Sequence, residues 1–198
     1  MDTAETLFAE RGFYGVSVAA IASHMGLTKQ GVLHYFNSKE KLYGAVLQRI
    51  SDDFIGHQLD AEQSSEDPAV RLKRFYGRLA TASTQSLRRN RLLIRELLDN
   101  NDRAAKAENW YLKDFLSRLI DMTRAVPAFH HLSDVQTLTM AYQWLGAVNY
   151  FLISPITLKS IFGAEFHGAM ANDFQDLMNH QIDAQILLVG QRTKAADK

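Results

Sequence analysis

Glycine divides the first fifty residues into short segments that each show helical periodicity. The segment 2–11 carries its apolar residues on one face and is followed by Gly12, a residue suited to ending a helix. The segment 18–25 repeats apolar residues at positions i, i+3, i+4 and i+7 and ends before Gly26. Helices this short are marginal alone and gain stability by packing their apolar faces together. The beginning of the chain is therefore predicted to be a compact cluster of short helices.

The second and third segments match the spacing of a helix-turn-helix. That motif needs a small residue where its helices cross, a glycine in the turn four residues later, and an apolar anchor six residues further on. Ala22, Gly26 and Val32 meet these three conditions. Apolar support is expected from three residues beside them, Ile21, Met25 and Leu27.

The rest of the chain also indicates helices rather than strands. It has only 3 prolines and no sustained alternation of polar and apolar residues. Apolar residues at four-residue steps from Leu42 predict a long fourth helix, and the polar stretch 56–67 is expected to be a loop. Further helices are predicted near 68–87, 89–99, 103–126, 134–153, 155–162 and 167–189, followed by a frayed tail. We predict an all-α chain with a three-helix helix-turn-helix head over 1–48 and a helical domain over 49–198.

Composition limits the kinds of chemical site and the cellular locations expected for the chain. The 198 residues include no cysteine, which excludes disulfides, thiolate metal sites and a cysteine nucleophile. No apolar run reaches the roughly 20 residues that a bilayer span requires, and the start at Met1 lacks the basic flank of a signal peptide. A cytoplasmic protein without membrane contact is expected.

The charges of the whole chain cancel, but they are distributed unevenly along the sequence. The 22 basic and 22 acidic residues give a formal net charge of zero, so any binding to nucleic acid must use a local patch. Three lysines, Lys29, Lys39 and Lys41, fall close together in the predicted head. The positive charge of the head is therefore expected on one edge.

Residues 4–47 contain three further patterns: Phe8-x-x-x-Gly12-Phe13, the turn that begins at Gly26, and HYFNSKEKL from His34 to Leu42. Through these patterns the segment resembles the TetR family of transcriptional repressors. The resemblance implies a DNA-binding head, a helical domain that binds an unidentified small-molecule effector, and a homodimer that binds a palindromic operator. It implies no enzymatic activity.

The third helix is expected to read DNA. Lys29 and Gln30 leave its first turn, where Lys suits guanine O6/N7 and Gln suits adenine N6/N7. Thr28 is predicted to cap the helix and bind phosphate, and Gly31 to let the backbone approach the sugar-phosphate wall. Further phosphate ligands are expected at Ser17 and, from the resemblance, at Tyr35 and Lys39, with His34 as another candidate. Tyr35 as a core aromatic and Lys39 as a solvated charge are the alternatives.

Two features depart from the resembled family. Leu33 stands where a Tyr is usual, and the chain opens at Met1 without the usual basic arm. Either the start is truncated or DNA affinity depends more on helices two to four. The missing arm, together with the small net charge, motivates the alternative that the head binds a protein partner instead of DNA.

The helical domain offers a predicted ligand pocket and a predicted dimer surface. Large apolar faces with polar tips occur at Trp110, Tyr111, Tyr142, Trp144 and Asn149, which are predicted to line the pocket unless they are plain core or interface residues. The helices near 134–153 and 167–189 are expected to pack against their copies as a four-helix interface. The apolar residues for this are Ala141, Leu145, Val148, Leu152, Phe174, Leu177, Met178, Ile182 and Leu188, which internal packing would explain equally well.

Other chemical motifs are weak. His130, His131 and Asp134 lack the i, i+4 histidine spacing of a helical metal site. Neither G-x-S-x-G nor H-E-x-x-H occurs, so no enzyme, metal or cofactor is predicted. The basic run Arg88, Arg89, Arg91 and Arg95 is interpreted as a solvated helix face.

Overall fold

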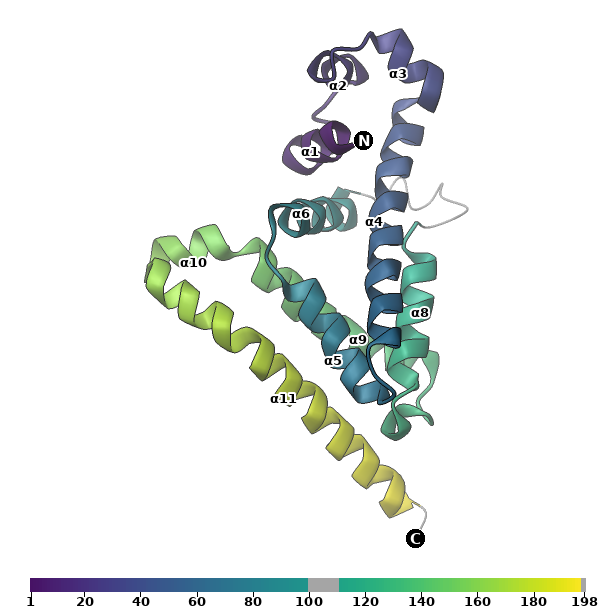
Figure 1. Cartoon of the computed structure of the whole chain (residues 1–198), viewed down its shortest axis with the longest axis vertical. Helices are drawn as coiled ribbons and strands as arrows, with labels where there is room; N and C mark the ends of the chain where they lie inside the picture. Colours follow the sequence, from purple (N-terminus) through teal and green to yellow (C-terminus); the bar gives the residue numbers. More distant parts are fainter. Residues whose placement is uncertain (100–110, 197–198) are drawn as a thin grey trace. The chain divides into compact units, whose positions relative to one another are not determined.

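The computed structural model describes residues 1–99 and 111–196, and its regular elements in that part are all helices (Figure 1). The prediction of an all-α chain is confirmed. The chain divides into two compact units, an N-terminal unit of Met1–Asp53 with Ala82–Asp114 and a C-terminal unit of Phe54–Thr81 with Phe115–Lys198. This grouping joins a segment beyond residue 80 to the head, while the division at 48/49 stays a prediction.

The N-terminal unit packs short helices around one apolar core. It consists of α1 (Asp2–Arg11), α2 (Val18–His24), α3 (Lys29–Phe36), the first half of α4 (Lys39–Gln63) and α6 (Thr84–Asp99). The core is fully buried at Phe8, Ile21, Val46 and Ile50. Helix α1 packs against α6 as well as α2, so α6 forms part of the support for the head.

Helix α4 is longer than the sequence indicated. The predicted loop at 56–67 is wrong over most of its length, because the helix continues to Gln63. Two residues within the polar stretch face the interior: Gln58 is fully buried and Ala61 is 5% exposed. The Gln58 amide donates a hydrogen bond to the carbonyl of Phe115 at 3.2 Å, which satisfies part of a polar side chain that otherwise looks solvent-facing.

The C-terminal unit is built around aromatic side chains. It contains α5 (Pro68–Ala80), most of α8 (Lys113–Arg124), a 3-10 turn (Pro127–Phe129), α9 (Asp134–Ile153), α10 (Pro155–Phe162) and α11 (Ala164–Ala196). The fully buried Tyr76 lies at its centre, with its ring 5.5 Å from that of Trp144 and its hydroxyl donating to the carbonyl of Ala141 at 3.2 Å. Burial raises the pKa of the Tyr76 phenol, which keeps it protonated and able to donate.

Other predicted boundaries also shift. The predicted helix 68–87 is two helices, because α5 ends at Ala80 and Ser83 caps α6 by accepting a hydrogen bond from the backbone N–H of Ser86 at 3.0 Å. Helix α8 begins at Lys113, and the predicted helical residues 103–110 lie outside the described part. Helix α11 continues past the predicted end at 189 to Ala196.

No helix within the two described ranges is by itself long and apolar enough to cross a bilayer. Helices α9 and α10 reach that length and composition only as a pair, and they meet at a bend of 62°.

Candidate DNA-binding interface

The turn between α2 and α3 has the geometry that its spacing predicts. Ala22 is 1% exposed and Val32 is 3% exposed, so both anchors are buried. Gly26 has a φ of 65°, in the left-handed region that glycine adopts without steric cost. Met25 and Leu27, predicted to support this corner from within, are instead 38% and 48% exposed. Three buried positions, Ile21 with the two anchors, are enough to hold the turn.

Both helices of the motif begin with a side-chain cap. The Ser17 hydroxyl accepts a hydrogen bond from the backbone N–H of Ala20 at 3.1 Å, and the Thr28 hydroxyl accepts one from the N–H of Gly31 at 3.0 Å. A Cβ on Gly31 would approach the Thr28 hydroxyl to 3.3 Å, so glycine keeps this turn open. The caps fix where α2 and α3 start and therefore which side chains occupy the first turn of α3.

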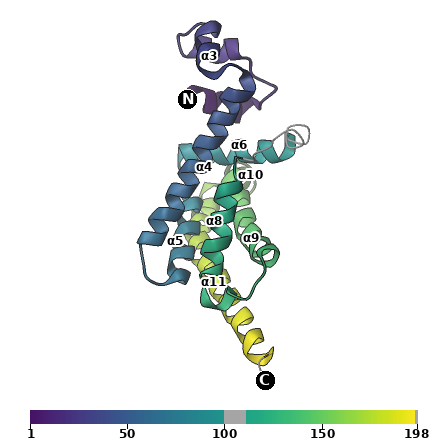
Figure 2. The same cartoon turned by 90° about the vertical axis from the view of Figure 1, so that its right-hand side faces the viewer.

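Helix α3 exposes Lys29, Gln30, His34 and Tyr35, while Gly31, Leu33 and Phe36 are half-buried. All of its residues are described, and Val32 alone is buried. Thr28, Lys29 and Gln30 are exposed together at its N-terminal end, where backbone N–H groups lack helical partners. Figure 2 shows α3 at the end of the N-terminal unit away from α6. The two predicted base readers therefore stand on a convex, accessible helix end.

The predicted phosphate ligands are also accessible. Ser17 and His34 are exposed, and Tyr35 is 78% exposed. The alternative of Tyr35 as a core aromatic is wrong. Its ring lies edge-on to that of His34 with centroids 5.7 Å apart, so the two aromatic side chains stand beside one another on the surface. Their DNA contacts stay predictions.

Lys39 is positioned by an aromatic ring. It is the first residue of α4, after Ser38, whose hydroxyl accepts a hydrogen bond from the N–H of Lys41 at 3.2 Å. The Lys39 ammonium lies 4.5 Å from the centroid of the Phe13 ring. Burial lowers the pKa of this ammonium, and the charge of Glu40 opposes the shift. Lys39 is thus half-buried on a ring face rather than freely solvated.

A cluster of buried charged side chains joins α1, α4 and α6 in the N-terminal unit. The sequence interpretation missed this cluster. The Glu5 carboxylate of α1 is 1% exposed and lies 3.6 Å from Nε of Arg89 and 3.9 Å from Nη1 of Arg88, both in α6. Arg89 also pairs with Asp53 of α4 and is only 4% exposed. The interpretation of this arginine run as a solvated face is therefore wrong for Arg89. The position of Arg89 on the inner face of an amphipathic helix was the available signal, but its partner Glu5 lies more than eighty residues away in sequence.

A second buried polar contact joins α4 to α6. The Tyr43 hydroxyl donates a hydrogen bond to Oε2 of Glu96 at 2.6 Å, and both side chains are 4% exposed. The ring of Tyr43 packs edge-on against Phe8 and Phe13, with centroids 4.9 and 5.0 Å away. Helix α6 thus contacts the aromatic cluster on which Lys39 rests.

The predicted ligand-pocket residues are distributed over both units. Trp110 lies outside the described residues. In the N-terminal unit, the Tyr111 side chain covers Gly44 of α4, where a Cβ would collide with it. In the C-terminal unit, Trp144 is 3% exposed and Tyr142 is 49% exposed, while Asn149 is half-buried. Of these three residues of α9, only Trp144 is buried in the core. A role of the predicted pocket residues in ligand binding stays a prediction.

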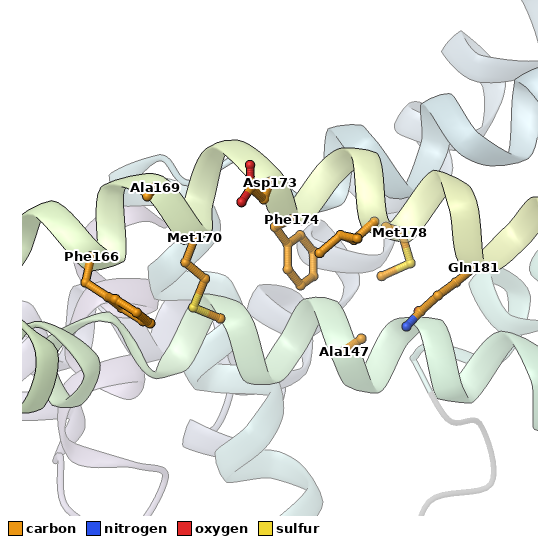
Figure 3. Close-up of a pocket in the computed structure, with 9 residues that line it drawn as sticks. Ala147, Phe166, Ala169, Met170, Asp173, Phe174, Met178 and Gln181 are labelled. Carbon is orange, nitrogen blue, oxygen red and sulfur yellow. The ribbon is translucent and has the colours of Figure 1, made fainter.

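An open groove of about 430 Å³ lies between α9 and α11 (Figure 3). Phe166, Met170 and Phe174 of α11 point into it, and Ala147 of α9 forms its opposite wall. None of the four described pocket residues lines this groove. Within residues 1–99 and 111–196, no three His, Cys, Asp or Glu side chains are grouped to hold a metal ion.

Known proteins share the head and the fold. Residues 1–46 match the family model of bacterial regulatory proteins of the tetR family. The chain is 34% identical over 73 residues to the HTH-type transcriptional repressor KstR2 of Rhodococcus jostii (strain RHA1), covering 37% of this chain and 36% of that protein. It is 33% identical over 91 residues to the HTH-type transcriptional regulator RutR of Escherichia coli (strain K12), covering 46% and 42%. The chain spans less than half the length of these curated relatives.

The similarity of fold extends further than the similarity of sequence. A crystal structure of a TetR-family transcriptional regulator from Rhodococcus sp. superimposes with a TM-score of 0.70, covering 93% of this chain and 95% of that one, at 17% identity. The match therefore concerns the fold, including the helical region where the curated relatives do not align. Residues 1–46 therefore match the head of bacterial regulatory proteins of the tetR family, and the chain shares its fold with a TetR-family regulator.

Proposed function

We propose that the chain is a DNA-binding transcriptional regulator that inserts α3 into the major groove. The observation that carries this proposal is the asymmetry of α3, which buries Val32 and leaves Lys29 and Gln30 exposed in its capped first turn. A helix that is anchored on one face and exposes the side chains of its first turn fits the groove without rearrangement. Lys29 and Gln30 contact base edges in this proposal.

The phosphate backbone is held by groups around α3. Ser17, Thr28 and Gly31 supply hydroxyl and backbone groups, and Tyr35 with His34 supplies exposed aromatic side chains. Lys39 supplies the charge that neutralises a phosphate, so affinity falls as salt concentration rises. Because Leu33 has no hydroxyl to offer, these groups carry the contact with the backbone.

We propose further that the regulator acts as a homodimer on a palindromic operator. Of the nine residues predicted for the interface, Ala141, Val148, Leu152, Met178 and Ile182 are buried within the chain's own core. The support comes instead from apolar side chains left exposed on α11: Phe166 is 53%, Leu177 is 60% and Leu188 is 55% exposed. Apolar groups exposed in a row along one helix favour a partner surface of the same kind, and a two-fold pair reads a palindrome.

The proposed regulator is a repressor that responds to a small molecule in the helical domain. Repression follows if the bound dimer blocks transcription, and the relative from Rhodococcus jostii is named a repressor. An effector that favours the wrong spacing of the two heads by about 1.4 kcal/mol weakens DNA binding tenfold. Trp144 lies in the core of that domain, so its fluorescence is expected to respond to a bound metabolite, and no response to any member of a metabolite panel would contradict a pocket there.

Selection of bound fragments from a random duplex library tests the proposal. The expected product is a pair of inverted half-sites, with their centres about 10 base pairs or a multiple apart. Light scattering on the same preparation is expected to give the mass of a dimer. Failure to enrich any sequence contradicts DNA reading, and a monomer at micromolar concentration contradicts the dimer.

A further inference from the structure

The ammonium of Lys39 rests on a ring whose position is set by other residues. Phe13 is 7% exposed and holds its ring under the Lys39 ammonium at 4.5 Å. Tyr43 follows Lys39 by one turn of α4 and packs edge-on against the same ring, with centroids 5.0 Å apart at 65°. The lysine and the tyrosine therefore contact the same phenylalanine from one face of α4.

Contacts of both the ring and the hydroxyl fix the orientation of the Tyr43 side chain. Its ring meets Phe8 at 4.9 Å and 82°, an edge-to-face arrangement that aromatic pairs favour. Its hydroxyl donates to Glu96 of α6 at 2.6 Å, the length of a charge-assisted hydrogen bond. Since Tyr43 and Glu96 are both 4% exposed, water does not compete freely for this bond.

We propose that Tyr43, held by Glu96, is a positioning residue that acts through Phe13 to orient the Lys39 ammonium for a DNA phosphate. The inference rests on the proposed function, because it assumes that Lys39 binds phosphate. A lysine side chain has many rotamers, and holding its ammonium on a fixed ring lowers the entropy lost when it binds. Helix α6 thereby contributes to DNA affinity through side chains that stay buried.

Electrostatics agree with a defined position for Lys39. Burial lowers the pKa of its ammonium, as expected for a charge that has left part of its hydration shell for an aromatic face. The charge of Glu40, the next residue of α4, opposes this shift. A partly desolvated ammonium gains more from a phosphate than a fully hydrated one does.

A double-mutant cycle between Tyr43 and Lys39 tests the inference. Tyr43→Phe removes the hydroxyl and keeps the ring, and its effect is measured on binding of a mixed-sequence duplex at low salt. In the unaltered chain we expect affinity to fall by at most about two- to fivefold, the loss that would follow if Phe13 no longer held the Lys39 ammonium. In the Lys39→Ala background the same substitution is expected to change affinity by less than about 1.5-fold, because the residue it positions is gone.

Two further variants separate positioning from stability. Tyr76→Phe removes another buried tyrosine hydrogen bond, in the C-terminal unit, and is expected to lower the unfolding temperature without changing DNA affinity. Glu96→Gln keeps an oxygen that accepts from Tyr43 and is expected to retain most of the affinity. Circular dichroism and thermal unfolding verify that each variant is folded at the temperature of the assay.

The outcomes are distinct. An unchanged affinity of Tyr43→Phe in the unaltered background overturns the inference. A loss of the same size with and without Lys39 also overturns it, because Tyr43 then acts on the head as a whole. Absence of duplex binding by the unaltered chain instead overturns the proposed function, on which the inference depends.

Discussion

The two units of this chain differ in the charges that they bury and in the side chains that their outer helices expose. The N-terminal unit encloses charged side chains such as Glu5 and Arg89 and exposes the polar side chains of Lys29 and Gln30 at the start of α3. The C-terminal unit has an aromatic core around Tyr76, yet Ile156 of α10 is 74% exposed and Leu177 of α11 is 60% exposed. The difference indicates two kinds of partner. The N-terminal surface suits a charged, hydrogen-bonding polymer, whereas the C-terminal surface suits another apolar surface.

Buried ion pairs in the N-terminal unit have a geometric role. Three helices that are distant in sequence, α1, α4 and α6, meet at Glu5, Asp53 and Arg89. Such a cluster adds little net stability over apolar packing, but it penalises any arrangement in which its partners separate. The head is thereby kept in one arrangement on α6, which DNA reading by a short helix requires.

The largest expected effect is the loss of Arg89. Arg89→Ala leaves the buried Glu5 carboxylate without its nearer guanidinium, and we expect the free energy of unfolding to fall by about 3–5 kcal/mol. Urea denaturation measures this free energy of unfolding. Arg91→Ala, a substitution at an exposed arginine of α6, is the matched control. A loss below about 1 kcal/mol would mean that the cluster does not hold the three helices together.

The second-largest effect is expected from a substitution on the exposed apolar face of α11. Leu177→Glu puts a charge on the proposed dimer surface, and we expect the dimer dissociation constant to rise at least about tenfold. Sedimentation equilibrium measures the constant. Leu59→Glu, on an exposed leucine of α4, is the control and is expected to leave it unchanged. Equal effects of the two substitutions would contradict an interface at Leu177.

A smaller effect is expected at the cap of the recognition helix. Thr28→Ala removes the acceptor for the Gly31 N–H and is expected to cost about 1 kcal/mol of stability, with weaker DNA binding. Thr28→Ser keeps the hydroxyl and should restore most of both. Thermal unfolding with a duplex titration checks this pair, and an alanine variant as stable as the serine variant would argue against the cap.

Local patterns predicted the head more completely than the rest of the chain. Ala22, Gly26 and Val32 lie within eleven residues and act on one turn, so their spacing carries the geometry. The helix through Gln58 was missed because its buried face contains an amide and alanine rather than a continuous apolar stripe. Met25 and Leu27 fit the apolar pattern but stay exposed, since the short helices have room for few inward side chains.

Contacts between distant segments could not be predicted in the same way. Arg89 looks like one member of a solvated basic run until α1 supplies Glu5, and nothing adjacent to Tyr43 indicates Glu96. Exposure of Lys29, Gln30 and Tyr35, in contrast, follows from a helix whose inward face is centred on the buried Val32. The accessibility of these side chains was therefore predictable from the sequence, while the packing behind them was not, and their DNA contacts stay predictions.

Comparison of Lys29→Ala with Lys39→Ala on a selected operator and its single-base variants tests the central claim, that α3 reads bases while its surroundings bind phosphate. Lys29→Ala is expected to cost about 1–3 kcal/mol and to relax the preference at one base pair. Lys39→Ala is expected to weaken binding to all sequences alike and to lower the slope of log K against log salt by about 1. Equal losses from both variants, independent of sequence, would contradict the account.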